Sequence, residues 1–264
     1  MKSSKNDKLL TFGGHLEVLR QMIFRVIAVA GTIAMTVFCF KETTWSILMA
    51  PSEWDFCTYR WIESAMHFMN IDFRFDEFHV QMIATDLSSQ FMTHITTAVY
   101  LGVLGASPYI LYELFRFISP ALYDNERKYS VQVAGIIYVL FLLGVLMSYF
   151  VLFPISFRFL GTYSVSAKVV SNITLDSYIS TFVSLTLVMG VVFQLPVIAF
   201  FLGKMGIVTS AMLANYRKHS LIVIMLVAAI ITPPDLMTLI LVTIPLYLLY
   251  EVSIRVVSWV EPTP

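Results

Sequence analysis

Charged side chains are scarce in this sequence. Asp, Glu, Lys and Arg make up 13% of its 264 residues, whereas a soluble domain carries roughly 25%. Hydrophobic residues make up 58%, and the mean hydropathy is +0.79. Because so few charges cannot keep a globule of this size in water, we expect most of the chain to lie in a lipid bilayer. This composition excludes a soluble enzyme, a nucleic-acid-binding protein and a disordered regulator.

The sequence also lacks the motifs of enzymes and metal sites. Its 2 cysteines, Cys39 and Cys57, form neither a disulfide framework nor a metal-ligand spacing. There is no G-x-S-x-G, no H-E-x-x-H and no glycine-rich phosphate loop. No cleavable signal peptide, long linker or internal repeat is visible. We therefore expect a non-enzymatic protein without a cofactor or metal, folded as a single integral membrane domain over residues 1–264.

Long apolar runs take the place of these motifs. A membrane-spanning helix needs about 20 apolar residues, and four runs reach or approach that length: 22–40, 91–112, 131–153 and 178–202. Two shorter runs, 221–231 and 236–250, flank the turn T-P-P-D at 232–235. The sequence thus predicts an all-α integral membrane protein with six transmembrane helices, of which the last two are short.

The positions of Lys and Arg predict the orientation of these helices. Alternate connecting segments, starting with the N-terminal one, hold 12 of the 17 basic residues. Since basic loops stay in the cytoplasm, both termini are expected there. The loop at 41–89 carries eight acids against three bases, and with its tryptophans it is expected to form a large outer cap of short helices. Residues 1–21 are expected to form a cytoplasmic amphipathic segment, because apolar residues recur there at helical spacing.

A few polar residues interrupt the apolar runs, where functional groups are expected. Arg25 is close enough to the membrane surface to extend its charge into water. Gln194 lies mid-span, and its amide needs a partner on a neighbouring helix, on another chain, or at a carbonyl freed by Pro196. Asp235 is expected at the third position of the last helix, after Thr232 as the N-cap, with room for a further role at the outer surface.

Several ordered motifs resemble the TatC family, the polytopic subunit of the twin-arginine protein translocase. They are G-H-L-E-V-L-R at 14–20, A-T-D at 84–86, S-P-Y-I-L-Y-E-L-F-R-F-I-S-P-A-L-Y-D-N-E-R-K at 107–128, Y-F-V-L-F-P at 149–154, G-V-V-F-Q-L-P at 190–196, T-P-P-D at 232–235 and I-P-L-Y-L-L-Y-E at 244–251. The resemblance covers nearly the whole chain in the family's order.

The resemblance implies a function and a setting. TatC-like proteins have six membrane helices with both termini cytoplasmic, and bind twin-arginine signal peptides of folded precursors. With single-span TatA/TatB-type partners they export those proteins, driven by the proton-motive force. The resemblance further implies a multi-pass protein of the bacterial plasma (inner) membrane, in contact with lipid, that self-associates in a receptor complex and binds no nucleic acid.

The resemblance also assigns roles to individual residues. The signal-peptide contacts fall on Glu126 and Phe117, with Glu17 and Arg20 in the N-terminal motif. Contact with a partner helix falls on Gln194, and outer-face roles fall on Pro51 and Asp235.

Three positions depart from the family pattern. Val18 stands where the family has glutamate, so Glu17 is the candidate substitute; Gln194 replaces a frequent glutamate, and Leu239 a frequent glutamine. Carboxylates suit the recognition of two guanidiniums because they bind them in bidentate geometry. The acids that flank the first three spans on the cytoplasmic side are Glu17, Glu113, Asp124 and Glu126.

Two other classes of protein remain open from the sequence. A small-solute transporter needs a polar pathway through the spans, and these spans supply few polar groups. A membrane scaffold without a transport role fits the same composition. Export of a folded twin-arginine reporter separates a translocase from both.

Overall fold

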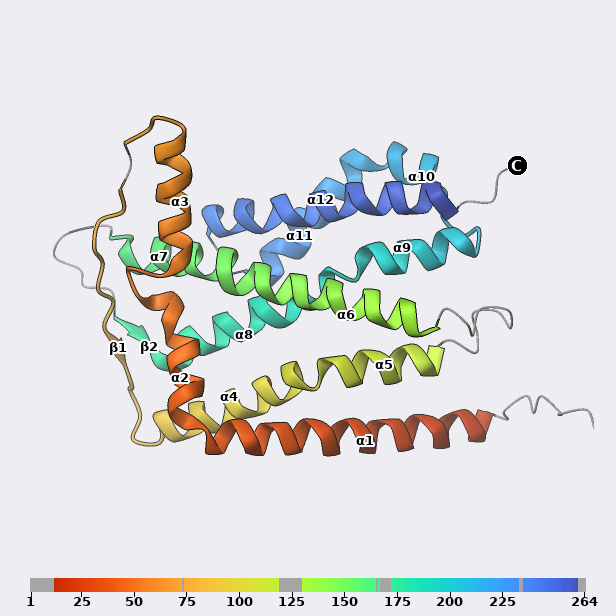
Figure 1. Cartoon of the computed structure of the whole chain (residues 1–264), viewed down its shortest axis with the longest axis horizontal. Coiled ribbons are helices and arrows are strands. Elements are labelled where there is room, and N and C mark those ends of the chain that lie inside the picture. Colours follow the sequence, from red (N-terminus) through yellow and green to blue (C-terminus); the bar gives the residue numbers. More distant parts are fainter. Residues whose placement is uncertain are drawn as a thin grey trace, which may run out of the picture.

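The computed structural model describes residues 12–72, 74–118, 130–164, 166, 172–232 and 235–260. Helices dominate this part of the chain (Figure 1). The α-helices outside the loop at 41–89 are α1 (Phe12–Cys39), α4 (Ser89–Gly105), α5 (Ser107–Ile118), α6 (Ser130–Met147), α7 (Phe153–Thr162), α8 (Leu175–Val192), α9 (Leu195–Lys204), α10 (Ser210–Asn215), α11 (Arg217–Ile231) and α12 (Leu236–Val260).

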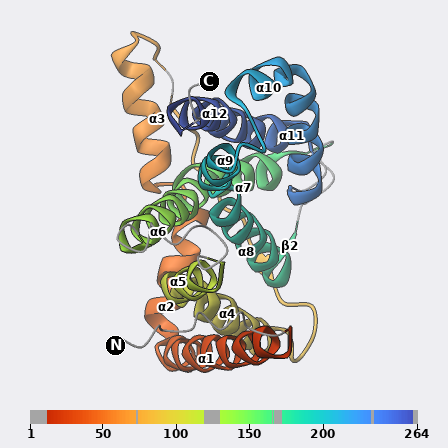
Figure 2. The same ribbon diagram turned by 90° about the vertical axis from the view of Figure 1, so that its right-hand side faces the viewer.

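The bundle is built in successive layers, visible end-on in Figure 2. Helix α1 packs on α4, α6 packs on α8, α9 packs on α12, and α12 in turn contacts α11. The start of α1 and the ends of α5, α9 and α12 lie at one end, here called the basic end after Arg20, Arg116, Lys204 and Arg255 (Figure 1). The opposite end carries the loop at 41–89 and is called the cap end.

The count of membrane spans is only partly settled by the described residues. Four stretches are long and apolar enough to cross a bilayer: Leu16–Cys39, Val133–Thr162, Leu175–Lys204 and Leu236–Val260. A fifth arises if α4 and the adjoining α5, which meet at a bend of 52°, are one broken span. Six spans with cytoplasmic termini therefore stay a prediction.

The last helix is longer than expected. We expected an apolar run that ends at Tyr250, but α12 continues to Val260 and has 25 residues. The helix passes Glu251 because this carboxylate pairs with Arg217, with Nε–Oε1 and Nη2–Oε2 distances of 2.7 and 3.1 Å. Helix α11 is short, as expected, with 15 residues. The prediction of two short helices is thus wrong for α12.

Close packing of the layers relies on glycine. A Cβ on Gly102 of α4 would lie 2.6 Å from the Cβ of Ala34 in α1. A Cβ on Gly144 of α6 would lie 2.5 Å from the carbonyl oxygen of Met189 in α8. Small residues let membrane helices approach until their backbones touch. Larger side chains at either position would force these helix pairs apart.

The cap end contains short elements, as the sequence predicted. They are α2 (Lys41–Met49), the 3-10 turn η1 (Ala50–Ser52), α3 (Cys57–Phe68) and the strand β1 (Met82–Ile83), which pairs in parallel with β2 (Ile173–Thr174). Arg158 of α7 stabilises this cap. Its guanidinium lies 4.3 to 5.2 Å from the ring centroids of Tyr59, Phe75 and Phe78, and it donates to the carbonyl of Asp76.

A π-helical stretch, Ser148–Leu152, joins α6 to α7. Pro154 follows it and has no N–H, so it cannot donate to the carbonyl of Phe150 four residues earlier. The hydroxyl of Thr58 in α3 donates to that carbonyl instead, and the Tyr59 hydroxyl donates to the carbonyl of Pro154 at 2.8 Å. Burial raises the pKa of the Tyr59 phenol, which keeps it a donor. The cap thus supplies a donor to the Phe150 carbonyl, which the proline leaves open, and a second donor to Pro154 itself.

Candidate functional site

Helix α1 brings two of the expected site residues to the basic end. It runs unbroken from Phe12 through the first span, so Glu17 and Arg20 stand on its first turns (Figure 1). Their charged atoms are 3.6 Å apart, and the side chains are 54% and 68% exposed. Gln21 also donates to the Glu17 carboxylate at 3.2 Å. Because an exposed pair at this distance is weak, Glu17 can exchange its partner for an incoming cation.

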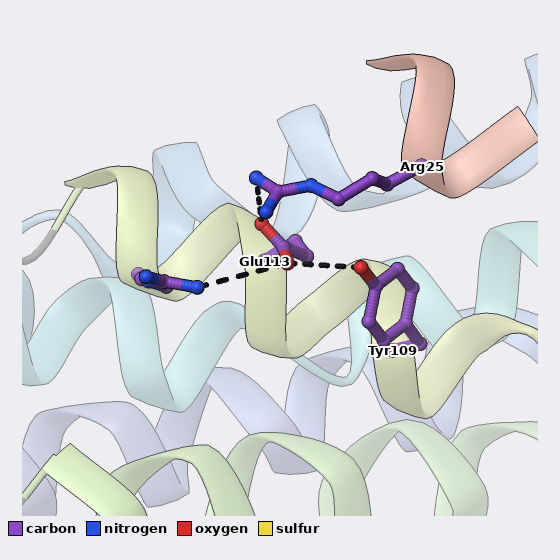
Figure 3. A network of polar contacts seen from close by, with 4 residues as sticks. Arg25, Tyr109 and Glu113 are labelled. Carbon is purple, nitrogen blue, oxygen red and sulfur yellow. Dashed lines mark hydrogen bonds and ion pairs between the residues drawn. The ribbon is translucent and has the colours of Figure 1, made fainter. Parts of the chain in front are cut away.

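A second carboxylate at the same end is buried. Glu113 of α5 is 4% exposed and accepts a hydrogen bond from Arg25 of α1 at 3.2 Å (Figure 3). Its other oxygen accepts from the hydroxyl of Tyr109 at 3.0 Å and lies 4.0 Å from a guanidinium nitrogen of Arg116. Both carboxylate oxygens are therefore engaged by donors of the same chain.

This network gives Glu113 a role different from the one its sequence position suggested. We had counted Glu113 among the acids at the cytoplasmic face and expected Arg25 to extend into water. The two residues instead pair across 88 positions of the sequence. A buried carboxylate is stable only when it is paired and hydrogen-bonded. The pairing cannot be found from spacing, and the available signal is that Arg25 lies inside an apolar run and Glu113 directly follows another.

Phe117 lies at the end of α5, one turn after Glu113, and is half-buried. It therefore reaches the basic end at which Glu17 and Arg20 stand (Figure 1). Glu126 and Asp124, the acids expected in the following loop, lie outside the described residues. The binding roles of Glu17, Arg20, Phe117 and Glu126 stay predictions.

Gln194 forms its hydrogen bonds within the chain. Its Nε2 donates to the carbonyl of Ile137 in α6 at 3.1 Å and to that of Gly190 at 3.4 Å. The Gly190 carbonyl is open because the N–H of Gln194 donates to Val191, where α8 ends. Its Oε1 is buried without a hydrogen-bond partner among the described residues. Contact with a partner helix stays a prediction.

The two residues expected at the outer face, Pro51 and Asp235, lie at the cap end and take part in local backbone structure. Pro51 is buried in η1. Asp235 directly precedes α12 and accepts from the N–H of Thr238 at 2.7 Å. Asp235 is thus the N-cap, whereas we expected it inside the helix with Thr232 as the cap. Thr232 instead donates to the carbonyl of Ala228 and closes the end of α11.

Among the described residues, no three His, Cys, Asp or Glu side chains lie close enough together to hold a metal ion. Three features lie at the basic end: an exposed carboxylate on α1, an ion pair between the half-exposed Arg25 of α1 and the buried Glu113 of α5, and an aromatic side chain one turn beyond Glu113. Such a surface can recognise a cationic peptide.

Comparison with known proteins identifies the family. Residues 14–245 match the family model described as Sec-independent protein translocase protein (TatC). A TatC from Blattabacterium is 33% identical, with 99% of each chain covered, and one from Carboxydothermus hydrogenoformans is 30% identical, with 97% of this chain and 96% of that protein covered. A crystal structure of the twin-arginine translocase receptor TatC superposes with a TM-score of 0.72 at 29% identity, covering 93% of this chain and 99% of the other. The chain belongs to the TatC family and is a multi-pass membrane subunit of the twin-arginine protein translocase.

Proposed function

We propose that this chain is the receptor subunit that binds twin-arginine signal peptides at its basic end. Together with single-span TatA/TatB-type partners, it moves folded proteins across the bacterial plasma membrane at the expense of the proton-motive force. The basic end then faces the cytoplasm, with both termini. The cap end faces outward.

The observation that carries the proposal is that an exposed carboxylate and an aromatic side chain lie at the same end of the bundle. Glu17 stands at the start of α1 and is 54% exposed, and Phe117 lies in the last turn of α5. The segment that follows Phe117 contains Glu126. Because surrounding basic residues repel an arginine pair, its binding depends on such local carboxylates.

Crosslinking of a twin-arginine peptide tests the proposal and the role of Glu126. In Glu126→Gln, crosslinking should fall by roughly 10- to 150-fold, because a hydrogen bond to a charged group is worth about 1.5–3 kcal/mol. Asp124→Asn is the matched control, since it removes an equal charge two residues away. A peptide with twin lysine should crosslink weakly to the unchanged protein, because lysine lacks the bidentate fork.

Undiminished crosslinking in Glu126→Gln would remove Glu126 from the site. Equal crosslinking of the twin-arginine and twin-lysine peptides to the unchanged protein would contradict the receptor function as a whole. Export of a folded twin-arginine reporter, in cells that lack their own TatC and co-express the cognate partners, then distinguishes a translocase from a scaffold or a small-solute transporter.

A further inference from the structure

We propose that Arg25 and Glu113 are positioning residues, which hold the α1 and α5 parts of the signal-peptide site at a fixed distance. This inference rests on the proposed function, because it concerns the same site. In this role the Arg25–Glu113 ion pair acts on the geometry of the site, and neither residue touches the peptide.

The first argument is the bend between α4 and α5. Helix α1 packs closely on α4, where Gly102 lets the two backbones approach. Beyond Ala106, however, α5 departs from the axis of α4 by 52°. Packing of α1 against α4 therefore does not by itself fix the direction of α5. The Arg25–Glu113 pair joins α1 to α5 on the far side of this bend (Figure 3).

The second argument is the distance along α5 from the bend to Phe117. Phe117 is 11 residues beyond Ala106, which corresponds to about 16 Å along a helix. A rotation of about 10° at the bend would move Phe117 by about 3 Å, using the same helical rise. A shift of that size is large against the tolerance of a bidentate guanidinium contact. A contact two turns beyond the bend is well placed to prevent it.

The third argument is that Glu113 is already paired within the chain. Its carboxylate accepts a hydrogen bond from Arg25 on one oxygen and from Tyr109 on the other, and Arg116 lies 4.0 Å from the second oxygen. At 4% exposure it is also out of reach of a peptide at the surface. Glu17, by contrast, is exposed and weakly paired. The two acids therefore have different tasks. Glu17 is available to the peptide, and Glu113 holds α5 in place relative to α1.

A distance measurement tests the positioning role without any peptide. Spin labels at Leu16 and Leu114, both exposed, report the separation of α1 and α5 in the full-length protein. Glu113→Gln should broaden or shift this distance distribution. Glu251→Gln is the matched control, because it breaks the comparable Arg217–Glu251 pair at the same end of the bundle and should leave the distribution unchanged. An unchanged distribution in Glu113→Gln would overturn the inference.

A covalent replacement of the ion pair tests its consequence for binding. In a background with Cys39→Ser and Cys57→Ser, the double variant Arg25→Cys/Glu113→Cys should bind a twin-arginine peptide on the order of tenfold more weakly. Linking the two new thiols with a short bis-maleimide restores a connection without restoring the charges. If the pair positions the helices, the linked protein should recover most of the lost affinity.

The outcomes separate this inference from the proposed function. If the linked protein stays as weak as the unlinked one, while the background binds normally, the charges act directly and the positioning role is wrong. If the background itself does not prefer twin arginine to twin lysine, the proposed function fails, and the spin-label distances still decide whether Glu113 positions α5.

Discussion

Glu17 and Glu113 have the same carboxyl group, yet their surroundings give them opposite properties. The Glu17 side chain is 54% exposed and the Glu113 side chain 5%. An exposed pair contributes between zero and about 1 kcal/mol. In the second pair the Arg25 side chain is 47% exposed, but loss of Arg25 would leave a buried carboxylate without its ionic partner, which is costly. Glu17 can therefore change partners readily. Glu113 cannot do so without leaving Arg25 unpaired.

This difference leads to a prediction for Glu17, which stands one residue before the position at which the family carries glutamate. Glu17→Gln should reduce export of a folded twin-arginine reporter, because it removes a carboxylate at the start of α1. Addition of Val18→Glu should restore part of the loss, although it projects about 100° away on the helix. Gln21→Ala is the control, since it removes the contact to Glu17 but keeps the charge. Normal export in Glu17→Gln would mean that the peptide is recognised without Glu17.

At the level of elements, the sequence predicted helices better than their ends. Apolar runs locate most of the spans because a bilayer demands continuous hydrophobic helices. Apolar runs predicted the wrong end for α12. The run stops before Glu251, but the helix continues because Arg217 pairs with this carboxylate. The bend after α4 and the π-helix before Phe153 were also not predicted, although a proline, Pro108 or Pro154, follows each of them.

The π-helix leads to a prediction about Thr58. Thr58→Val should lower the thermal stability of the purified protein in detergent, because the Phe150 carbonyl loses the donor that compensates for Pro154. A buried acceptor without a partner costs about 1–3 kcal/mol. Thr36→Val is the control, since that exposed hydroxyl bonds only within its own helix. In a Pro154→Ala background, which regains a backbone donor, the effect of Thr58→Val should shrink. An equal loss in both backgrounds would contradict the compensation.

For the whole molecule, the sequence indicated the class, the family resemblance and the two chemically different ends. It could not indicate which layers touch, because nearly all of the apolar faces are alike in composition. The pairing of α1 with α5 through Arg25 and Glu113, and of α6 with Gln194, became visible only in three dimensions. In both contacts, polar side chains on separate helices bond to one another or to a backbone carbonyl. On an isolated helix in the membrane, the same polar groups would face lipid.

Gln194 takes part in this internal packing, and its role in assembly stays a prediction. Its Nε2 is committed to the carbonyls of Ile137 and Gly190, and its Oε1 is buried without a partner among the described residues. An interhelical hydrogen bond in a membrane is worth about 0.6–2 kcal/mol. If Gln194 forms such a bond with a single-span partner, which requires the packing around its buried oxygen to open, Gln194→Leu should weaken that association by roughly 3- to 30-fold.

Co-purification with the single-span partner and thermal unfolding of the isolated chain, measured on the same variants, separate the two possible roles. Gln194→Leu should lower co-purification, whereas Gln194→Glu should retain it because the acceptor oxygen remains. Both variants lose the donor to the Ile137 carbonyl, because leucine has no polar group and an ionised glutamate has no hydrogen to donate. A loss of thermal stability common to both variants therefore reports the contact between Gln194 and α6. If Gln194→Leu lowers only thermal stability and keeps full partner binding, Gln194 acts within the chain and its docking role is wrong.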